Sequence, residues 1–125
     1  MPTTVKQMLA AAAAEVPTIA AAEAKALHAA GQAVFIDLRE PPELTASGKV
    51  PGALAIPRGL REFRTDPEGA RDPALAAGKT VITYCASGGR AALAGKTLKE
   101  LGYTDVRNLG GFKDWVAAGG AVEPV

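Results

Sequence analysis

Short apolar runs alternate along this chain with segments whose apolar residues recur at helical spacing. The run at residues 79–85 shows no polar alternation, as expected for a strand in the middle of a parallel sheet. Residues 89–102 show the helical pattern instead, and a glycine ends it. The apolar positions of that helix are Ala91, Ala94, Leu98 and Leu101. This alternation of strands and helices predicts an α/β layer fold with a mainly parallel sheet.

Three other segments are predicted to be strands. Residues 58–73 are predicted to be a long, charge-dense connection. The predicted strands are residues 33–38, 53–57 and 104–109. They lie between segments with helix signals, as βαβ units require. In a sheet of this kind, ligands bind beyond the carboxyl ends of the strands.

Helix start and stop signals place the helices. Thr18 is predicted to cap the second helix, which Gly31 ends, and a single helical turn is expected near Glu43. The predicted helices cover residues 3–15, 18 to about 30, 75–77, 89–102 and a short segment within 110–120. We expect the first helix to form an N-terminal extension over residues 1–16, and residues 17–125 to form one domain.

The composition narrows the classes of function. With 125 residues, 48% of them hydrophobic, the chain can fold as one domain with a substantial core. A net charge of +1 without a basic stripe argues against nucleic-acid or membrane binding, and no apolar run is long enough to span a bilayer. One cysteine and one histidine argue against a disulfide and a metal site. No signal peptide is recognised, so a reducing, cytoplasmic setting is expected.

The single cysteine, Cys85, ends the predicted strand 79–85 and precedes the loop that opens the next helix. Free N–H groups and the helix dipole favour an anion at such a helix start, and glycine permits the positive φ that turns N–H groups inward. Arg90 adds a permanent positive charge. We therefore expect Cys85 to be largely thiolate near neutral pH. The loop expected to hold it consists of Ala86, Ser87, Gly88, Gly89 and Arg90.

The structural alternative is a buried, inert cysteine followed by an ordinary glycine-containing turn. The strand-end position of Cys85, the two glycines and the arginine together favour a nucleophile over this alternative. A Cys–His hydrolase is not expected, because the only histidine, His28, lies on a predicted N-terminal helix. Backbone dipoles and Arg90 must then activate the thiol.

Charged residues at other strand ends are further candidates. Asp37 is expected to support the structure. Arg39 is a candidate substrate-binding residue, and pairing with an acid such as Glu40 or Glu43 is the equally weighted alternative. Arg58 directly follows a strand end and is a candidate for binding or steering an anionic donor.

Three segments, in this order, resemble the rhodanese-like family, and together they extend over roughly residues 17–120. "VFIDLREPPE" resembles the family's strand ending in Asp-x-Arg-Glu. "SGKVPGALAIP" resembles its Gly-His-Ile-Pro-Gly-Ala segment, with Lys49 where the family often has histidine. The stretch 84–115 resembles its active-site loop, helix and Gly-Gly-x-x-x-Trp closure, with Ala91 where serine is common. The resemblance implies a three-layer domain over residues 17–125, with a mainly parallel central sheet flanked by helices.

The resemblance also implies a sulfurtransferase. Cys85 would take the outer sulfur of a small anionic donor such as thiosulfate and carry it as a persulfide. A thiol or cyanide would accept that sulfur, and a protein donor or acceptor is an open alternative. The implied reaction needs no metal, no cofactor and no second cysteine.

Two rival functions fit parts of the pattern. Cys-dependent phosphatases and arsenate reductases also pair a thiolate with an arginine, usually with five residues between them, whereas this chain has four. Tyr84 stands where phosphatases usually have histidine. A non-enzymatic rhodanese-like module for binding or regulation often lacks the cysteine, which this chain keeps. We therefore expect sulfur transfer and little phosphatase activity.

Overall fold

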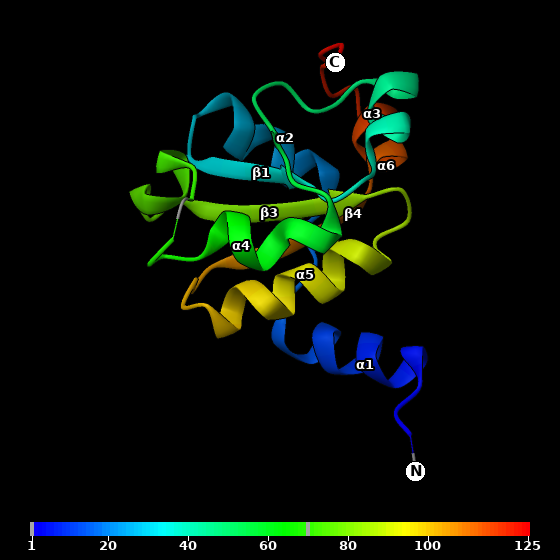
Figure 1. Cartoon of the computed structure of the whole chain (residues 1–125). Coiled ribbons are helices and arrows are strands. Elements are labelled where there is room, and N and C mark those ends of the chain that lie inside the picture. Colours follow the sequence, from blue (N-terminus) through cyan, green and yellow to red (C-terminus); the bar gives the residue numbers. More distant parts are fainter. Residues whose placement is uncertain (1, 70) are drawn as a thin grey trace.

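Four parallel strands form the central sheet of the computed structural model, which describes residues 2–69 and 71–125 (Figure 1). The strands are β1 (Ala33–Asp37), β2 (Leu54–Ala55), β3 (Thr80–Cys85) and β4 (Val106–Gly111). Their order across the sheet is β2-β1-β3-β4, so β3 is paired on both sides. The predicted parallel α/β fold is confirmed, with a strand within or overlapping each predicted run.

Helices cover both faces of this sheet. They are α1 (Val5–Glu15), α2 (Ala21–Ala29), α3 (Pro41–Ser47), α4 (Arg61–Thr65), α5 (Gly89–Glu100) and α6 (Phe112–Ala117), with two 3₁₀ turns, η1 (Arg58–Leu60) and η2 (Pro73–Ala77). Side chains alternate along the strands. Val34 and Ile36 therefore pack in one cluster with Leu98 of α5, whereas Phe35 packs in the other with Trp115 of α6. The result is the three-layer arrangement that the family resemblance implied.

Helix α1 lies against α5, on the side of α5 that faces away from the sheet (Figure 1). Ala12 and Val16 are buried. An ideal Cβ on Gly95 of α5 would lie 3.0 Å from a Val16 methyl carbon, so the small residue permits this close approach. The predicted first helix is confirmed. Its status as a separate extension over residues 1–16, whose first residue lies outside the described ranges, stays a prediction.

Two local predictions about helices need correction: the cap predicted at Thr18 is wrong, and the helix predicted near Glu43 is too short. Thr18 does not cap α2: residues 17–19 are extended and pair with Asn108 beside β4, and α2 begins only at Ala21. The expected single turn near Glu43 is the seven-residue helix α3. Proline at its first positions and a capping box with Glu43 as its third residue favour this longer helix.

The predicted connection over residues 58–73 is partly helical. It contains η1 and α4 and the start of η2, while Ala70 within it lies outside the described residues. Thr65 of α4 is buried, and Tyr103 donates a hydrogen bond to its carbonyl oxygen over 2.6 Å. The segment is therefore attached to the turn after α5.

The C-terminal tail is anchored at Lys49, one of the positions where the chain departs from the family pattern. Lys49 and Glu123 exchange backbone hydrogen bonds of 2.9 and 2.8 Å, and the Lys49 Nζ lies 2.6 Å from the Glu123 carboxylate. An ideal Cβ on Gly48 would lie 2.7 Å from the Glu123 carbonyl oxygen. The tail is thus part of the packed structure.

None of the helices in the described ranges is long and apolar enough to cross a membrane. The longest of them, α5, has 12 residues, whereas a spanning helix needs about 20. The cytoplasmic setting expected from the sequence stays a prediction.

Candidate active site

Cys85 is the last residue of β3, so it lies at the carboxyl edge of the parallel sheet. Its side chain belongs to the buried cluster on the α5 side, and only 1% of the residue is exposed. The next two residues, Ala86 and Ser87, are exposed, and α5 begins at Gly89. The predicted strand–loop–helix arrangement is confirmed, and it places the thiol beside the N-terminus of α5.

One backbone donor of the loop faces the sulfur. The Gly88 N–H donates to Cys85 Sγ over 3.0 Å. Gly88 can do so because it adopts a φ of +102°, a conformation that glycine reaches without the steric penalty of a Cβ. Gly89 instead has ordinary helical backbone. The sequence predicted inward N–H groups along the whole loop, from Ala86 to Arg90. Among the hydrogen bonds of the described residues, Gly88 alone has this role.

Asn108 of β4 holds Gly88 in place. Its amide nitrogen donates to the Gly88 carbonyl oxygen over 3.2 Å, and its Oδ1 accepts from the Gly110 N–H over 2.8 Å. The β3–β4 register shifts at this point, and an ideal Cβ on Gly88 would lie 3.1 Å from the Gly110 Cα. Sequence reasoning missed Asn108. The available signal was Asn-x-Gly-Gly at residues 108–111, since glycine in a strand marks a bulge or a close backbone approach.

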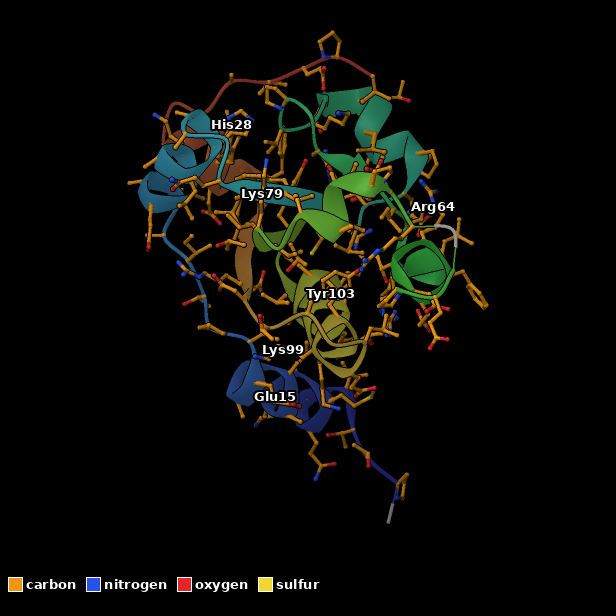
Figure 2. All side chains as sticks on the ribbon, turned by 90° about the vertical axis from the view of Figure 1, so that its left-hand side faces the viewer. Glu15, His28, Arg64, Lys79, Lys99 and Tyr103 are labelled. Atoms are coloured by element: carbon orange, nitrogen blue, oxygen red, sulfur yellow. The ribbon has the colours of Figure 1, made fainter. Side chains whose placement is uncertain are left out.

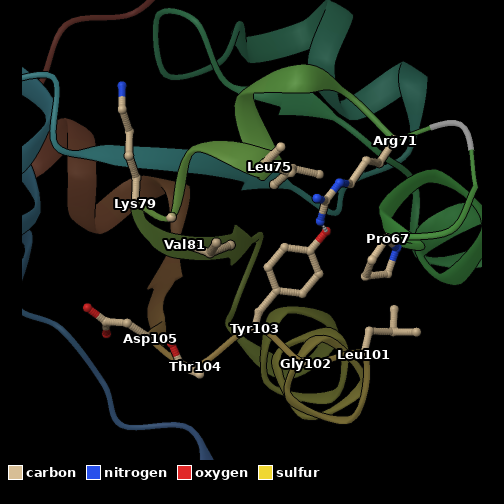
Figure 3. A pocket seen from close by; sticks show the side chains of 12 residues that line it. Pro67, Arg71, Leu75, Lys79, Val81, Leu101, Gly102, Tyr103, Thr104 and Asp105 are labelled. Carbon is tan, nitrogen blue, oxygen red and sulfur yellow. Dashed lines mark hydrogen bonds between the residues drawn. The ribbon is translucent and has the colours of Figure 1, made fainter.

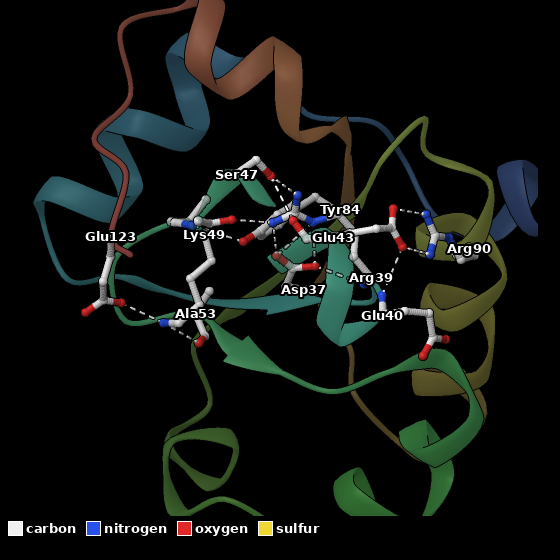
Figure 4. A network of polar contacts seen from close by, with 12 residues as sticks. Asp37, Arg39, Glu40, Glu43, Ser47, Lys49, Ala53, Tyr84, Arg90 and Glu123 are labelled. Atoms are coloured by element: carbon white, nitrogen blue, oxygen red, sulfur yellow. Dashed lines mark hydrogen bonds and ion pairs between the residues drawn. The ribbon is translucent and has the colours of Figure 1, made fainter. Parts of the chain in front are cut away.

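Arg90, in the first turn of α5, forms a bidentate ion pair with Glu43 of α3 (Figure 4). Its Nη1 and Nη2 lie 2.7 and 2.9 Å from the two Glu43 carboxylate oxygens. The hydrogen bonds to Glu43 raise the pKa of Arg90, and the nearby Cys85 raises it further. In return, Arg90 lowers the pKa of Glu43 to about 2. Sequence reasoning had named Glu43 only as a partner for Arg39, so its role at the loop was missed.

Arg39 is buried, and its guanidinium is engaged by several partners. Its Nε and Nη2 donate to the Asp37 carboxylate over 2.9–3.2 Å, and its two Nη atoms also donate to Ser47 Oγ and the Gly48 carbonyl oxygen. The guanidinium carbon lies 4.4 Å from the centre of the Phe112 ring. Burial acts to lower the pKa of Arg39, but the Asp37 carboxylate outweighs this and raises it overall. Removing one member of such a buried pair typically costs about 3–5 kcal/mol.

This geometry corrects one expectation and supports another. The partner of Arg39 is Asp37, not Glu40 or Glu43, because Glu43 is turned toward the loop and Asp37 is fully buried beside the guanidinium. Asp37 is buried in this pair, and its supporting role stays a prediction. Arg39 also lines a groove of about 640 Å³ beside Ala86, with walls largely from α6. Substrate binding by Arg39 therefore stays a prediction.

Arg58, the remaining candidate, and the single histidine both lie away from this loop. Arg58 lines a cavity of about 270 Å³ between α1, α5 and the η1–α4 segment, and Cys85 and its loop do not line it. A different cavity, of about 300 Å³, lies where the strands begin, around Arg71 and Tyr103 (Figure 3). His28 is seen from that same side (Figure 2), and its ring packs edgewise against core aromatic rings. The structure brings neither Arg58 nor His28 to the thiol.

The assembled site concentrates positive potential at one sulfur atom. The Gly88 N–H, the N-terminal end of α5 and the Arg90 guanidinium each present positive charge or partial charge near this atom. A thiolate in this setting can attack an electrophilic atom and form a covalent intermediate. Within residues 2–69 and 71–125, no group of three His, Cys, Asp or Glu side chains is placed to hold a metal ion.

Known proteins share both the sequence and the fold. The family model of the rhodanese-like domain matches residues 20–118. Human thiosulfate:glutathione sulfurtransferase is 32% identical over 108 residues, which cover 80% of this chain and 93% of the human protein. The structure of a human single-domain sulfurtransferase is 30% identical with a TM-score of 0.66, over 82% of this chain and 96% of that one.

A solved structure from Rhodopseudomonas palustris CGA009 matches nearly the whole chain. It is 39% identical with a TM-score of 0.86, and the match covers 98% of this chain and 99% of that one. That protein is of unknown function and is described as a possible tyrosine phosphatase. Since so much of the chain is covered, the similarity includes α1, which lies outside the range of the family model.

The Glu43–Arg90 pair predicts a pH-dependent contribution to stability. Both side chains are about one-third exposed, at 34% and 31%, so solvent screens the pair and we expect it to contribute about 1 kcal/mol at pH 7. The pKa of Glu43 is lowered in the folded protein, so this contribution is present above its ordinary value of 4.5. It is lost as the pH falls toward about 2. Urea unfolding should therefore show Glu43→Gln less stable than the parent at pH 7, with a difference that shrinks below pH 4.5.

Glu68→Gln is the matched control, because Glu68 is exposed and its side chain has no hydrogen bond or ion pair among the described residues. It should change the free energy of unfolding little at either pH. A Glu43→Gln deficit that stays constant down to pH 2 would contradict the assignment of the lowered pKa to this pair.

Proposed function

The chain belongs to the rhodanese-like domain family, and from this we propose that it is a sulfurtransferase that carries sulfane sulfur as a persulfide on Cys85. The proposed donor is thiosulfate or a related small anion. The proposed acceptor is a low-molecular-weight thiol, with cyanide as a substitute in the assay. The human relative, whose name gives thiosulfate and glutathione as substrates, supports this choice of substrate classes.

The first half of the proposed reaction loads the enzyme. The Cys85 thiolate attacks the outer sulfur of thiosulfate, and a new S–S bond forms at Sγ. The S–S bond within thiosulfate breaks, and sulfite leaves with the bonding electron pair. The product is an enzyme persulfide whose terminal sulfur carries the negative charge. No electron is gained or lost overall, so no oxidant or reductant is needed.

The second half of the proposed reaction transfers the sulfur from Cys85 to the acceptor. The thiolate of the acceptor attacks the terminal sulfur of the persulfide and forms a new S–S bond. The bond between that sulfur and Sγ breaks, and Cys85 leaves again as a thiolate. The two half-reactions share one covalent intermediate, so the kinetics should be ping-pong.

The observation that carries the proposal is the 3.0 Å hydrogen bond from the Gly88 N–H to Sγ. Cys85 is nucleophile in the first step and leaving group in the second, and a stabilised thiolate serves both steps. Arg90 adds a fixed positive charge near the same atom. The thiol is nearly covered, so we propose that both substrates approach over the exposed Ala86 and Ser87.

Replacement of the sulfur atom tests the proposal directly. We expect Cys85→Ser to abolish thiosulfate-dependent sulfur transfer, because Cys85 is the only thiol in the chain. The parent protein treated with thiosulfate should gain the mass of one sulfur atom, and the variant should gain none. Circular dichroism checks that the variant keeps its fold. Full transfer activity in a folded Cys85→Ser protein would rule out the persulfide mechanism.

Phosphate-ester hydrolysis is the second candidate, and the description of the Rhodopseudomonas palustris structure favours it. Two features of this chain oppose it. Only four residues separate Cys85 from Arg90, so the loop is shorter than the usual phosphatase loop. Both terminal nitrogens of Arg90 also bind Glu43, which leaves the guanidinium less available to a phosphate.

We therefore expect turnover of p-nitrophenyl phosphate to be at least about 1,000-fold slower than sulfur transfer, a barrier difference of about 4 kcal/mol. Both activities should be measured on one preparation across a range of pH. Efficient phosphate hydrolysis that disappears in Cys85→Ser would show that the loop serves phosphoryl chemistry.

A further inference from the structure

Arg58 has no ion-pair partner among the residues that the structure describes. Its Nε is buried and has no hydrogen-bond partner among the described residues. No ion pair of its guanidinium occurs within residues 2–69 and 71–125 either, although eight carboxylate groups there pair with other cations. Buried polar groups are nearly always satisfied in native proteins, and an unsatisfied one calls for an explanation such as an ion.

The surroundings of Arg58 supply further positive charge. The cavity of about 270 Å³ that it lines is also lined by Arg61 and Lys96, and Glu100 is the one acidic residue of its wall. Three polar side chains also line it, namely Thr3 before α1, Gln7 of α1 and Thr97 of α5. Three cations therefore face one carboxylate in this small cavity.

The neighbouring carboxylates neutralise part of this charge. Glu62 lies 3.4 Å from Arg61 Nε, and two carboxylates lie near Lys96 Nζ, Glu100 at 3.2 Å and Glu15 at 4.0 Å. Among the described residues, this leaves Arg58 as the cation of the cavity without an ion pair. Burial nevertheless lowers the pKa of Arg61, and the positive charge of Arg58 adds to this while Glu62 opposes it. Arg61 is thus destabilised as a cation in part by Arg58. An anion bound in the cavity would supply a counter-charge to both guanidinium groups.

We propose that this cavity binds a small, doubly charged tetrahedral oxyanion, such as sulfate or hydrogen phosphate. Arginine presents N–H groups in a fork that matches neighbouring oxygens of such an anion, and Lys96 adds a point charge. The volume is just below the range of about 300–1,000 Å³ that is typical of small-molecule sites, which suits a ligand of a few atoms. Met8 and Leu93 supply the apolar part of the wall.

The site is independent of the thiol. Cys85 and residues 86–90 do not line the cavity, so anion binding there does not rest on the proposed sulfur transfer. The walls come from α1, α5 and the η1–α4 segment. A bound anion would hold these three elements together and stabilise the folded protein.

The experiment uses the full-length Cys85→Ser protein, so that chemistry at the thiol cannot contribute. Sodium sulfate is titrated in at constant ionic strength while ¹H–¹⁵N spectra are recorded. We expect saturable shifts of the Arg61 and Thr97 amides and of the Arg58 side chain. Arg58→Gln should weaken binding at least tenfold. Lys96→Gln, at a half-exposed position on α5, should weaken it at least threefold and serves if Arg58→Gln does not fold.

Arg64→Gln is the matched control, because it removes the same charge from an exposed position on α4 that does not line the cavity (Figure 2). It should change the affinity less than twofold. An equal loss in Arg64→Gln, or shifts that never saturate, would mean general charge screening and would overturn the proposal. Shifts centred on residues 86–90 would place the anion at the other site and would overturn it too.

Separate titrations with sulfate, thiosulfate and acetate show which class of anion the cavity binds. Equal affinities for sulfate and thiosulfate would support a general oxyanion site, and a preference for thiosulfate would support a second site for a sulfur donor. Acetate, with a single charge, should bind at least tenfold more weakly than either. Acetate binding as tight as that of sulfate would contradict the assignment to a tetrahedral dianion.

Discussion

A single backbone constraint underlies the site: Gly88 must keep a left-handed conformation while its N–H faces the sulfur of Cys85. Any other residue would pay a steric penalty of about 1–2 kcal/mol for that conformation, and its Cβ would press on the Gly110 backbone. The partner of Gly88 in this contact is β4, where the strand bulges and the Asn108 side chain donates a hydrogen bond to the Gly88 carbonyl oxygen. The end of one strand, the irregularity of its neighbour and the first turn of α5 thus fix one hydrogen bond, and the proposed chemistry depends on it.

Arg39 and Arg90 both lie near this site, but they differ in burial and therefore in what their ion pairs contribute. Arg39 is 3% exposed and bound to the fully buried Asp37, so loss of either partner would strand a charge inside the protein. It fixes the segment between β1 and α3. Arg90 is about one-third exposed, and its pair with Glu43 is screened by solvent, so this pair contributes less to stability. This pair mainly fixes a position, because it ties α5, the helix that follows the loop, to α3.

The sequence was sufficient where the signals are local. Apolar runs, glycine stops and proline positions predicted the strands, α5 and the place of Cys85 between them, because each signal acts within a few residues. The side-chain partners could not be predicted in the same way. Glu43 and Arg90 are 47 positions apart, and Asn108 and Gly88 are 20 apart, so only the packed fold brings them together. Thr18 shows the opposite error: its capping propensity is real, but pairing of its backbone beside β4 overrides it. Arg58 was expected directly after a strand end, but β2 ends at Ala55, and η1 carries Arg58 to the α1–α5 cavity.

The central claim, that the Gly88 N–H activates Cys85, is tested most directly by the pH dependence of thiol alkylation in two neighbouring variants. Gly88→Ala opposes the positive φ, whereas Gly89→Ala adds a methyl group to ordinary helical backbone, with Leu9 Cδ2 at 3.9 Å as its nearest neighbour. The account predicts that the midpoint of the alkylation profile rises in folded Gly88→Ala and stays at the parent value in Gly89→Ala. An unchanged midpoint in folded Gly88→Ala, or an equal rise in both variants, would contradict it.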